Sequence, residues 1–194
     1  IAKGPAHRPV AAGKCSFCHA SHGSNEPGMT KLAGAAQCTQ CHSIEKQGLE
    51  AKHHGFALAK ARCTSCHDPH AGAAGKKALA KAVPHRPYAQ DKCDDCHGDR
   101  RTGATVQPVP ELCFKCHEGQ RAWLSAPVVH APLQSRESCL SCHGPHAGKA
   151  TALLDRAGDK LCFSCHDARP FRRRFVHDAL ESGCTTCHNP HSSK

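Results

Sequence analysis

The chain is 194 residues long, and only 39% of its residues are hydrophobic and 4% aromatic. A soluble domain of this length normally buries a sizeable core of side chains, so this composition argues against a fold that rests on side-chain packing alone. The formal charge of +10 at pH 7 would ordinarily suggest an anionic partner such as nucleic acid.

Every one of the sixteen cysteines falls in a C-x-x-C-H motif. In chain order, the eight motifs are Cys15/Cys18/His19, Cys38/Cys41/His42, Cys63/Cys66/His67, Cys93/Cys96/His97, Cys113/Cys116/His117, Cys139/Cys142/His143, Cys162/Cys165/His166 and Cys184/Cys187/His188. The motif is typical of covalent c-type haem attachment. The thiols form thioether bonds to the porphyrin, and the histidine is placed to bind the iron axially. The sequence therefore predicts eight haem c groups, each with its iron.

Two other uses of C-x-x-C pairs fit less well. Paired motifs could assemble tetrahedral zinc sites, but zinc does not explain why a histidine always follows the second cysteine. A disulfide framework suits small secreted chains, but it leaves the same histidines without a role. Haem attachment uses all three residues of each motif.

The motifs recur as an internal repeat. One unit consists of an upstream histidine, a C-x-x-C-H with another histidine three residues later, a spacer, and a second C-x-x-C-H. Residues 7–42, 54–97 and 130–166 fit this unit, residues 177–194 fit its first half, and the Cys113 motif stands alone. We expect the units to form one elongated domain over residues 1–194.

Secondary structure is predicted to be modest. Short helices are expected at 45–60, 76–81, 111–118, 149–155 and 172–181, where Ala, Leu, Lys and Glu cluster. Thirteen prolines and sixteen glycines interrupt the rest, and residues 106–110 are a candidate linker that we expect to be a surface loop. The predicted fold is mostly irregular and haem-packed, with short α-helices and little or no β-sheet.

Ten histidines lie outside the motifs. Eight haem irons need at most eight distal ligands, so the supply of histidines slightly exceeds the need. Four follow a motif histidine by three residues, namely His22, His70, His146 and His191. Five lie seven to nine residues before a motif, namely His7, His54, His85, His130 and His177. We expect these nine to be distal ligands and His53 to be a bystander. Met29 is the single methionine, so at most one iron could have the His/Met ligation that raises the potential.

Each complete unit contains two C-x-x-C-H motifs and two candidate distal histidines, so it can supply its own distal ligands. On that basis His7 and His22 serve the first unit, His54 and His70 the second, His130 and His146 the third, and His177 the Cys184 motif. The iron of the Cys113 motif is then left over. We favour His85 over His191 as its ligand, because His85 is nearer in sequence.

The runs His67-Asp-Pro-His70, His143-Gly-Pro-His146 and His188-Asn-Pro-His191, with the motifs that they extend, resemble the doubled C-x-x-C-H cytochromes. That family consists of multihaem periplasmic and outer-surface electron carriers, typical of bacteria that respire metals or other poorly accessible acceptors. The resemblance covers most of the chain and implies that upstream and +3 histidines are distal ligands. The lone Cys113 motif and the truncated last unit depart from the family pattern.

Haem attachment also changes the charge and the expected location. Sixteen propionates would lower +10 to about −6, and eight ferric centres would return it to about +2, which argues against nucleic acid as the partner. The sequence contains no run of about 18 apolar residues, so it predicts no membrane span. The chain begins at Ile1 rather than methionine, which suggests a removed signal peptide. We therefore expect a periplasmic or extracellular protein.

Three functions remain to be compared. The first is electron transfer through a row of bis-histidine haems, with other redox proteins as partners and no enzymatic activity. The second is a reductase of nitrite, hydroxylamine or a sulfur oxyanion, which would keep one haem without a distal ligand. The third is a conductive filament, in which copies of the same chain associate head to tail. The histidine supply favours the first.

Overall fold

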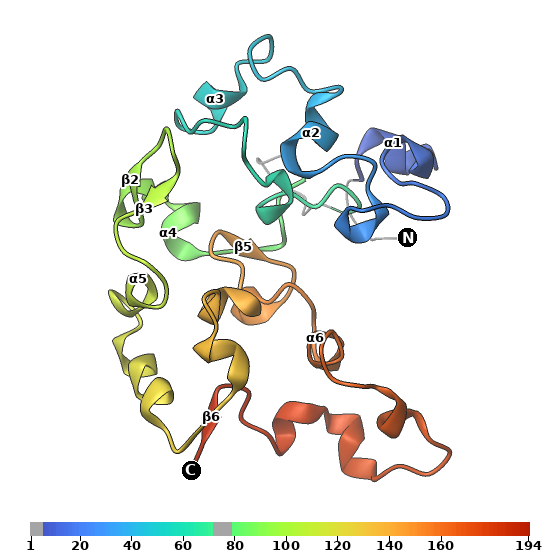
Figure 1. The fold of residues 1–194 in the computed structure, drawn as a ribbon, viewed down its shortest axis with the longest axis vertical. Coiled ribbons are helices and arrows are strands. Elements are labelled where there is room, and N and C mark those ends of the chain that lie inside the picture. The colour runs from blue at the N-terminus through green and yellow to red at the C-terminus, as the bar shows by residue number, and fades with distance from the viewer. Residues whose placement is uncertain (1–5, 72–78) are drawn as a thin grey trace. The chain divides into compact units, whose positions relative to one another are not determined.

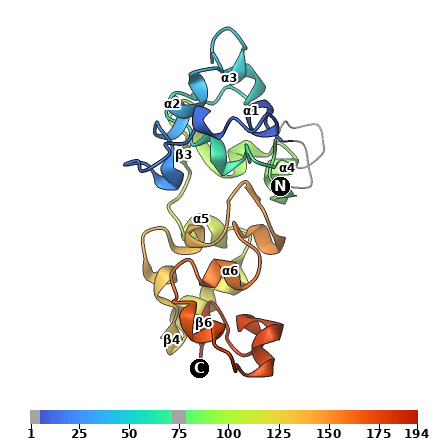
Figure 2. The same cartoon turned by 90° about the vertical axis from the view of Figure 1, so that its right-hand side faces the viewer.

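The structure is a computed structural model, and it describes residues 6–71 and 79–194. The chain follows an irregular path in which single helical turns alternate with loops (Figure 1). The view turned by 90° shows the same short coils and, over the described residues, no layered sheet (Figure 2). This architecture confirms the predicted fold class, mostly irregular with short helices.

The α-helices are all very short. They are α1 (Arg8–Ala11), α2 (Gly34–Thr39), α3 (Leu49–Lys52), α4 (Arg86–Ala89), α5 (Glu111–Phe114) and α6 (Asp159–Cys162). Eleven 3₁₀ turns accompany them in the described part of the chain: η1 (Cys15–Phe17), η2 (Pro27–Met29), η3 (Cys63–Ser65), η4 (Cys93–Asp95), η5 (Glu118–Ser125), η6 (Ala131–Gln134), η7 (Ser138–Ser141), η8 (Thr151–Leu153), η9 (Arg169–Arg172), η10 (Asp178–Ser182) and η11 (Cys184–Thr186). Among the described residues, no helix has the length and apolar character that a membrane crossing needs.

Three antiparallel two-stranded ladders are present. They pair β1 (Val83–Pro84) with β5 (Ala147–Gly148), β2 (His97–Asp99) with β3 (Ala104–Thr105), and β4 (Val128–Val129) with β6 (Ser192–Ser193). Figure 2 shows β4 and β6 together near the C-terminus. These pairs are too short to make a sheet that could carry a core.

The predicted helices were longer than those observed. Of 45–60 only α3 is helical, because Gly48 before it and His54 after it both have positive φ. Segment 111–118 contains α5 and the start of η5, whereas 149–155 and 172–181 contain only 3₁₀ turns. Of 76–81, residues 76–78 lie outside the described part and 79–81 are not helical. Helices such as α2 were missed because four to six residues are too few to show a helical period.

The chain divides into two compact units. The N-terminal unit consists of Ile1–Ala82 and Arg86–Val106, and the C-terminal unit of Val83–His85 and Gln107–Lys194. The boundary at Val106 falls at the start of the candidate linker 106–110, whose first residues are exposed, as expected for a surface loop. The single domain expected over 1–194 stays a prediction.

Neither unit has a conventional side-chain core. Among the described residues, the buried hydrophobic side chains are only Ala35, Phe114 and Ala147. Large apolar side chains lie instead at the surface of the polypeptide, including Phe17 within the Cys15 motif and Leu140 within the Cys139 motif. The distribution matches the prediction that attached apolar groups, rather than side chains, hold these units together.

Candidate haem sites and their axial histidines

Each C-x-x-C-H motif forms one tight turn. In seven of the eight motifs the motif histidine donates its backbone N–H to the carbonyl of the first cysteine, as His19 does to Cys15 (N···O 3.0 Å) and His166 to Cys162 (2.9 Å). The second cysteine of each motif donates to the same carbonyl at 3.1–3.3 Å. The turn therefore brings two thiols and one imidazole together from five consecutive residues, the set that covalent haem attachment needs.

The second cysteines of the motifs have sulfurs within reach of an approaching porphyrin. Four of these residues are exposed, namely Cys41, Cys116, Cys165 and Cys187, and four are partly buried, namely Cys18, Cys66, Cys96 and Cys142. All sixteen cysteines are free, which is consistent with haem attachment. The attachment role of each cysteine stays a prediction.

Two kinds of turn carry the motifs. Five motifs form 3₁₀ turns at their first cysteines: Cys15, Cys63, Cys93, Cys139 and Cys184. Three have the first cysteine within or at the end of an α-helix: Cys38 in α2, Cys113 in α5 and Cys162 in α6. The three helical motifs each follow one 3₁₀ motif along the chain. The local structure thus groups the motifs in successive pairs: the Cys15 motif with the Cys38 motif, the Cys93 motif with the Cys113 motif, and the Cys139 motif with the Cys162 motif.

The ring nitrogens of several histidines are oriented by backbone carbonyls. Among motif histidines, His19 Nδ1 lies 2.8 Å from Gly28 O, His97 Nδ1 3.0 Å from Gly103 O, and His143 Nδ1 2.6 Å from Ala152 O. A carbonyl only accepts, so each Nδ1 must carry the proton. The lone pair of a neutral imidazole is then at Nε2, free for a metal, and such a support is usual behind metal-binding histidines.

Six pairs of imidazoles face each other across nearly the same distance. Their ring centroids are 5.8 Å apart for His7–His42, 5.8 Å for His19–His70, 6.0 Å for His53–His67, 6.2 Å for His85–His117, 6.1 Å for His130–His166 and 6.2 Å for His143–His191. Each pair contains one motif histidine and one of the ten others. Every pair lies within one of the two units.

This separation fits two imidazoles bound to opposite sides of one metal. Metal–imidazole bonds are about 2 Å long, so two opposed nitrogens lie about 4 Å apart, and adding about 1 Å from each nitrogen to its ring centre gives about 6 Å. Rings in direct face-to-face contact are closer, as for Trp123 and His191, whose centroids are 4.0 Å apart at 11°. The paired histidines therefore fit bis-histidine haem iron.

In three pairs an upstream histidine meets the histidine of a helical motif. His7 faces His42, His85 faces His117, and His130 faces His166. Burial and the neighbouring His42 ring lower the pKa of His7, which favours the neutral form that binds metal. The placement of His85 beside the Cys113 motif is the arrangement that the sequence analysis favoured.

In two pairs a +3 histidine meets the motif histidine of a 3₁₀ motif elsewhere in the chain. His70 faces His19, and His191 faces His143. The expected self-sufficient units would have kept His70 beside the Cys63 and Cys93 motifs, and would have left His191 to cap a haem elsewhere or none. Burial, His143 and His130 lower the pKa of His191.

Backbone hydrogen bonds hold these arrangements in place. The N–H of His7 donates to Pro69 O (3.2 Å), and that of His130 to His191 O (2.9 Å). In the same way the N–H of His85 donates to His146 O (2.8 Å). Each of these three upstream histidines thus adjoins a segment that bears a +3 histidine, which a search for repeats along the sequence cannot reveal.

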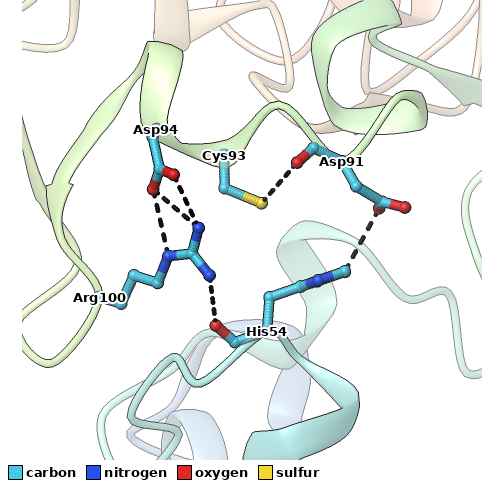
Figure 3. A network of polar contacts seen from close by, with 5 residues as sticks. All are labelled: His54, Asp91, Cys93, Asp94 and Arg100. Atoms are coloured by element: carbon cyan, nitrogen blue, oxygen red, sulfur yellow. Dashed lines mark hydrogen bonds and ion pairs between the residues drawn. The ribbon is translucent and has the colours of Figure 1, made fainter.

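His54 does not lie where the sequence analysis placed it. The imidazole that faces His67 is that of the adjacent His53, expected to be a bystander. His54 Nε2 is instead 3.3 Å from Asp91 Oδ1, and Arg100 binds both the His54 carbonyl (2.9 Å) and the Asp94 carboxylate (Figure 3). The physical reason is the left-handed φ of 57° at His54, which turns the chain after α3.

The other expected distal ligands are placed as follows. His22 is exposed. The backbone carbonyl of His146 accepts a hydrogen bond from the backbone N–H of His85. His177 lies at the start of η10, where its Nδ1 accepts the Ala179 N–H (3.1 Å). Because Nδ1 accepts, the proton of the neutral ring is at Nε2. Among residues 6–71 and 79–194, no imidazole faces the ring of His188.

Some attachment cysteines of different motifs nearly touch. Cys63 lies close to Cys38, and burial together with this neighbouring thiol raises the pKa of Cys38 to about 11. Cys162 and Cys184 are similarly close, and the Asp159 carboxylate with them raises the pKa of Cys184 to about 11. Asp159, Cys162 and Cys184 place their ligand atoms within 4.8 Å of one another, but both sulfurs belong to haem motifs, so this cluster is no separate metal site.

Comparison with known proteins identifies a family and a relative of this chain. Residues 7–47, 85–122 and 130–170 match the family model for the doubled CXXCH motif. Over 189 residues, the chain is 26% identical to the multiheme cytochrome MtrA of Shewanella baltica, an alignment that covers 82% of this chain and 50% of that relative. The chain therefore spans about half the length of this curated relative. The matched segments join the same motifs that the two kinds of turn pair, a grouping that differs from the expected unit 54–97 and the lone Cys113 motif.

Proposed function

We propose, from the premise that this chain belongs to the doubled CXXCH motif family, that it carries electrons through eight covalently attached haems with two axial histidines each. The observation that carries the proposal is the set of six imidazole pairs separated by 5.8–6.2 Å. Its MtrA relative, named a multiheme cytochrome, is consistent with electron transport.

The polypeptide contributes attachment, ligation and spacing. Haem, when bound, supplies a one-electron ferric/ferrous couple. The C-x-x-C-H turns fix the porphyrin edge through two sulfurs, and carbonyls such as Gly28 O hold the motif imidazole with Nε2 free. The paired imidazole would supply the remaining ligand of a bound haem iron, which would keep substrates off the iron and favour low potentials.

The close cysteines support electron passage between neighbouring groups. Because Cys63 lies close to Cys38, porphyrins bonded to these two cysteines would have neighbouring edges in the N-terminal unit. The contact of Cys162 with Cys184 does the same in the C-terminal unit. We propose that electrons pass between motifs at these sulfur-linked edges.

The partners and the location belong to the same proposal. Covalent c-type attachment is a feature of compartments outside the cytoplasm, so we place the protein in the periplasm or outside the cell, within respiratory electron transport. Its donors and acceptors are other redox proteins that approach exposed haem edges.

The haem number provides the direct test. Mass spectrometry of the purified protein should show eight covalent haem additions, because every cysteine belongs to a complete motif. The ferric absorption and EPR spectra should be dominated by low-spin iron, and a reduced redox partner should reduce the protein fully. Fewer than eight additions, or a mainly high-spin spectrum, would contradict the proposed function.

A second candidate rests on His188, whose ring faces no imidazole among the residues that the structure describes. The sixth position on that iron can be closed by a histidine from a second copy, as in a head-to-tail filament, or can remain open to a small substrate, as in a reductase of nitrite, hydroxylamine or a sulfur oxyanion. Exposed His22 is a suitable donor for the filament.

Carbon monoxide distinguishes these two arrangements. Under this second candidate, about one haem in eight should bind it in dilute reduced protein, because His177 Nδ1 is engaged by Ala179 and the neutral ring carries its proton at Nε2. If copies supply the ligand, the binding fraction should fall as protein concentration rises, and His22→Ala should abolish that dependence. A fraction that is independent of concentration, together with nitrite or hydroxylamine turnover, favours the reductase.

A further inference from the structure

The Cys63 motif has an axial pair unlike the other five. The ring planes of His53 and His67 are inclined by 70°, with centroids 6.0 Å apart. The remaining pairs are inclined by only 10–31°. The distance is therefore that of the other pairs, and the orientation alone is different.

The orientation of His53 is fixed by α3. His53 terminates this helix, where its backbone N–H contacts the carbonyls of Leu49 and Glu50 at 3.0 Å. Its Nδ1 lies 2.7 Å from the same Leu49 carbonyl, so Nδ1 is the donor and Nε2 is the free ligand atom. The backbone N–H and the ring Nδ1 of His53 thus both donate to the Leu49 carbonyl, which restricts rotation of the partly buried ring.

The neighbouring His54 is held away from this position. Its left-handed backbone, the contact of its Nε2 with Asp91, and the bond from Arg100 to its carbonyl direct it toward the Cys93 motif (Figure 3). Arg100 is itself held by two short contacts with Asp94 Oδ1 and Oδ2, at 2.8 and 2.9 Å. The two adjacent histidines consequently have separate positions.

We propose that His53, rather than His54, is the distal ligand of the Cys63 haem, and that its crossed ring plane makes this haem electronically distinct. The inference rests on the proposed bis-histidine ligation. Parallel axial imidazoles donate π density into the same iron d orbital and split the dxz and dyz pair, which gives a rhombic low-spin ferric EPR spectrum. Crossed imidazoles leave the pair nearly degenerate, which gives one strongly anisotropic signal at low field.

EPR of the ferric full-length protein tests the assignment. The wild type should show a strongly anisotropic low-spin signal that integrates to about one haem in eight, beside the rhombic signals of the near-parallel pairs. In His53→Ala this signal should disappear, and a high-spin signal of equal intensity should replace it. Added imidazole should return that iron to the low-spin form, because the attachment of the haem by Cys63 and Cys66 is unaffected.

His54→Ala is the matched control, one residue away and equally a loss of one imidazole. The His54→Ala variant should keep the anisotropic signal, since the His54 ring of the wild type contacts Asp91 and not the motif histidine. Loss of the signal in His54→Ala but not in His53→Ala would overturn the inference, as would its absence from a wild type that is otherwise low-spin. A mainly high-spin wild type would instead overturn the proposed function, so the two failures are distinguishable. Haem number by mass and unchanged rhombic signals verify that each variant is folded.

Discussion

A chain produced without its haems should be disordered throughout both units. Its circular dichroism should be that of an unfolded polypeptide, and heating should produce no cooperative transition. The reason is the near absence of a side-chain core, since Ala35, Phe114 and Ala147 are the buried hydrophobic residues of the described chain. Folding is then coupled to haem loading, as it is to metal binding in small metal-dependent domains.

Expression in a cytoplasm that lacks the attachment machinery provides the haem-free chain, and the holoprotein in the same buffer is the control. Phe175, which is 83% exposed, illustrates how little of the apolar surface the polypeptide buries by itself. A haem-free form that unfolds cooperatively would contradict the prediction.

Removing a distal histidine should change the spin state of one particular iron. His85→Ala should leave the Cys113 haem five-coordinate and high-spin, because the His85 ring lies opposite His117. His191→Ala should do the same to the Cys139 haem, opposite His143. Each variant should convert about one haem in eight, and the double variant about two, since the sites share no ligand.

Absorption and EPR spectra measure the high-spin fraction, and His22→Ala, at an exposed histidine outside the six ring pairs, is the control in dilute protein. To identify the iron, His85→Ala is repeated in a chain in which Cys113 and Cys116 are replaced by Ala. In that background the substitution should add no high-spin signal. An added signal there, or none in the single variant, would show that His85 serves another haem.

The C-x-x-C-H turns could be predicted from the sequence because all their geometry is local. Two cysteines and one histidine within five residues form a single turn, and no tertiary contact is needed to bring them together. The upstream histidines were recognisable too, as the placement of His7 and His130 beside motif histidines illustrates. Short helices such as α2 were missed because they owe their existence to tertiary context rather than to propensity.

The pairing of distal histidines with irons depended on information that spacing does not contain. His70 reaches His19 because the segment before it accepts a hydrogen bond from His7, a contact between distant parts of the chain. The choice between His53 and His54 depended on one backbone angle and on Asp91. A signal for the correct grouping was nevertheless present, since the longest gap between successive motifs separates Cys63 from Cys93.

The pairing of upstream histidines with helical motifs also sets an order in time. A chain leaves the ribosome with its N-terminus first. His42 finds its partner His7 already delivered, whereas His19 must wait until His70 has emerged. In the C-terminal unit His166 is likewise served early by His130, and His143 waits for His191. In the proposed ligation, both histidines of the second motif in each such pair are therefore available before both histidines of the first.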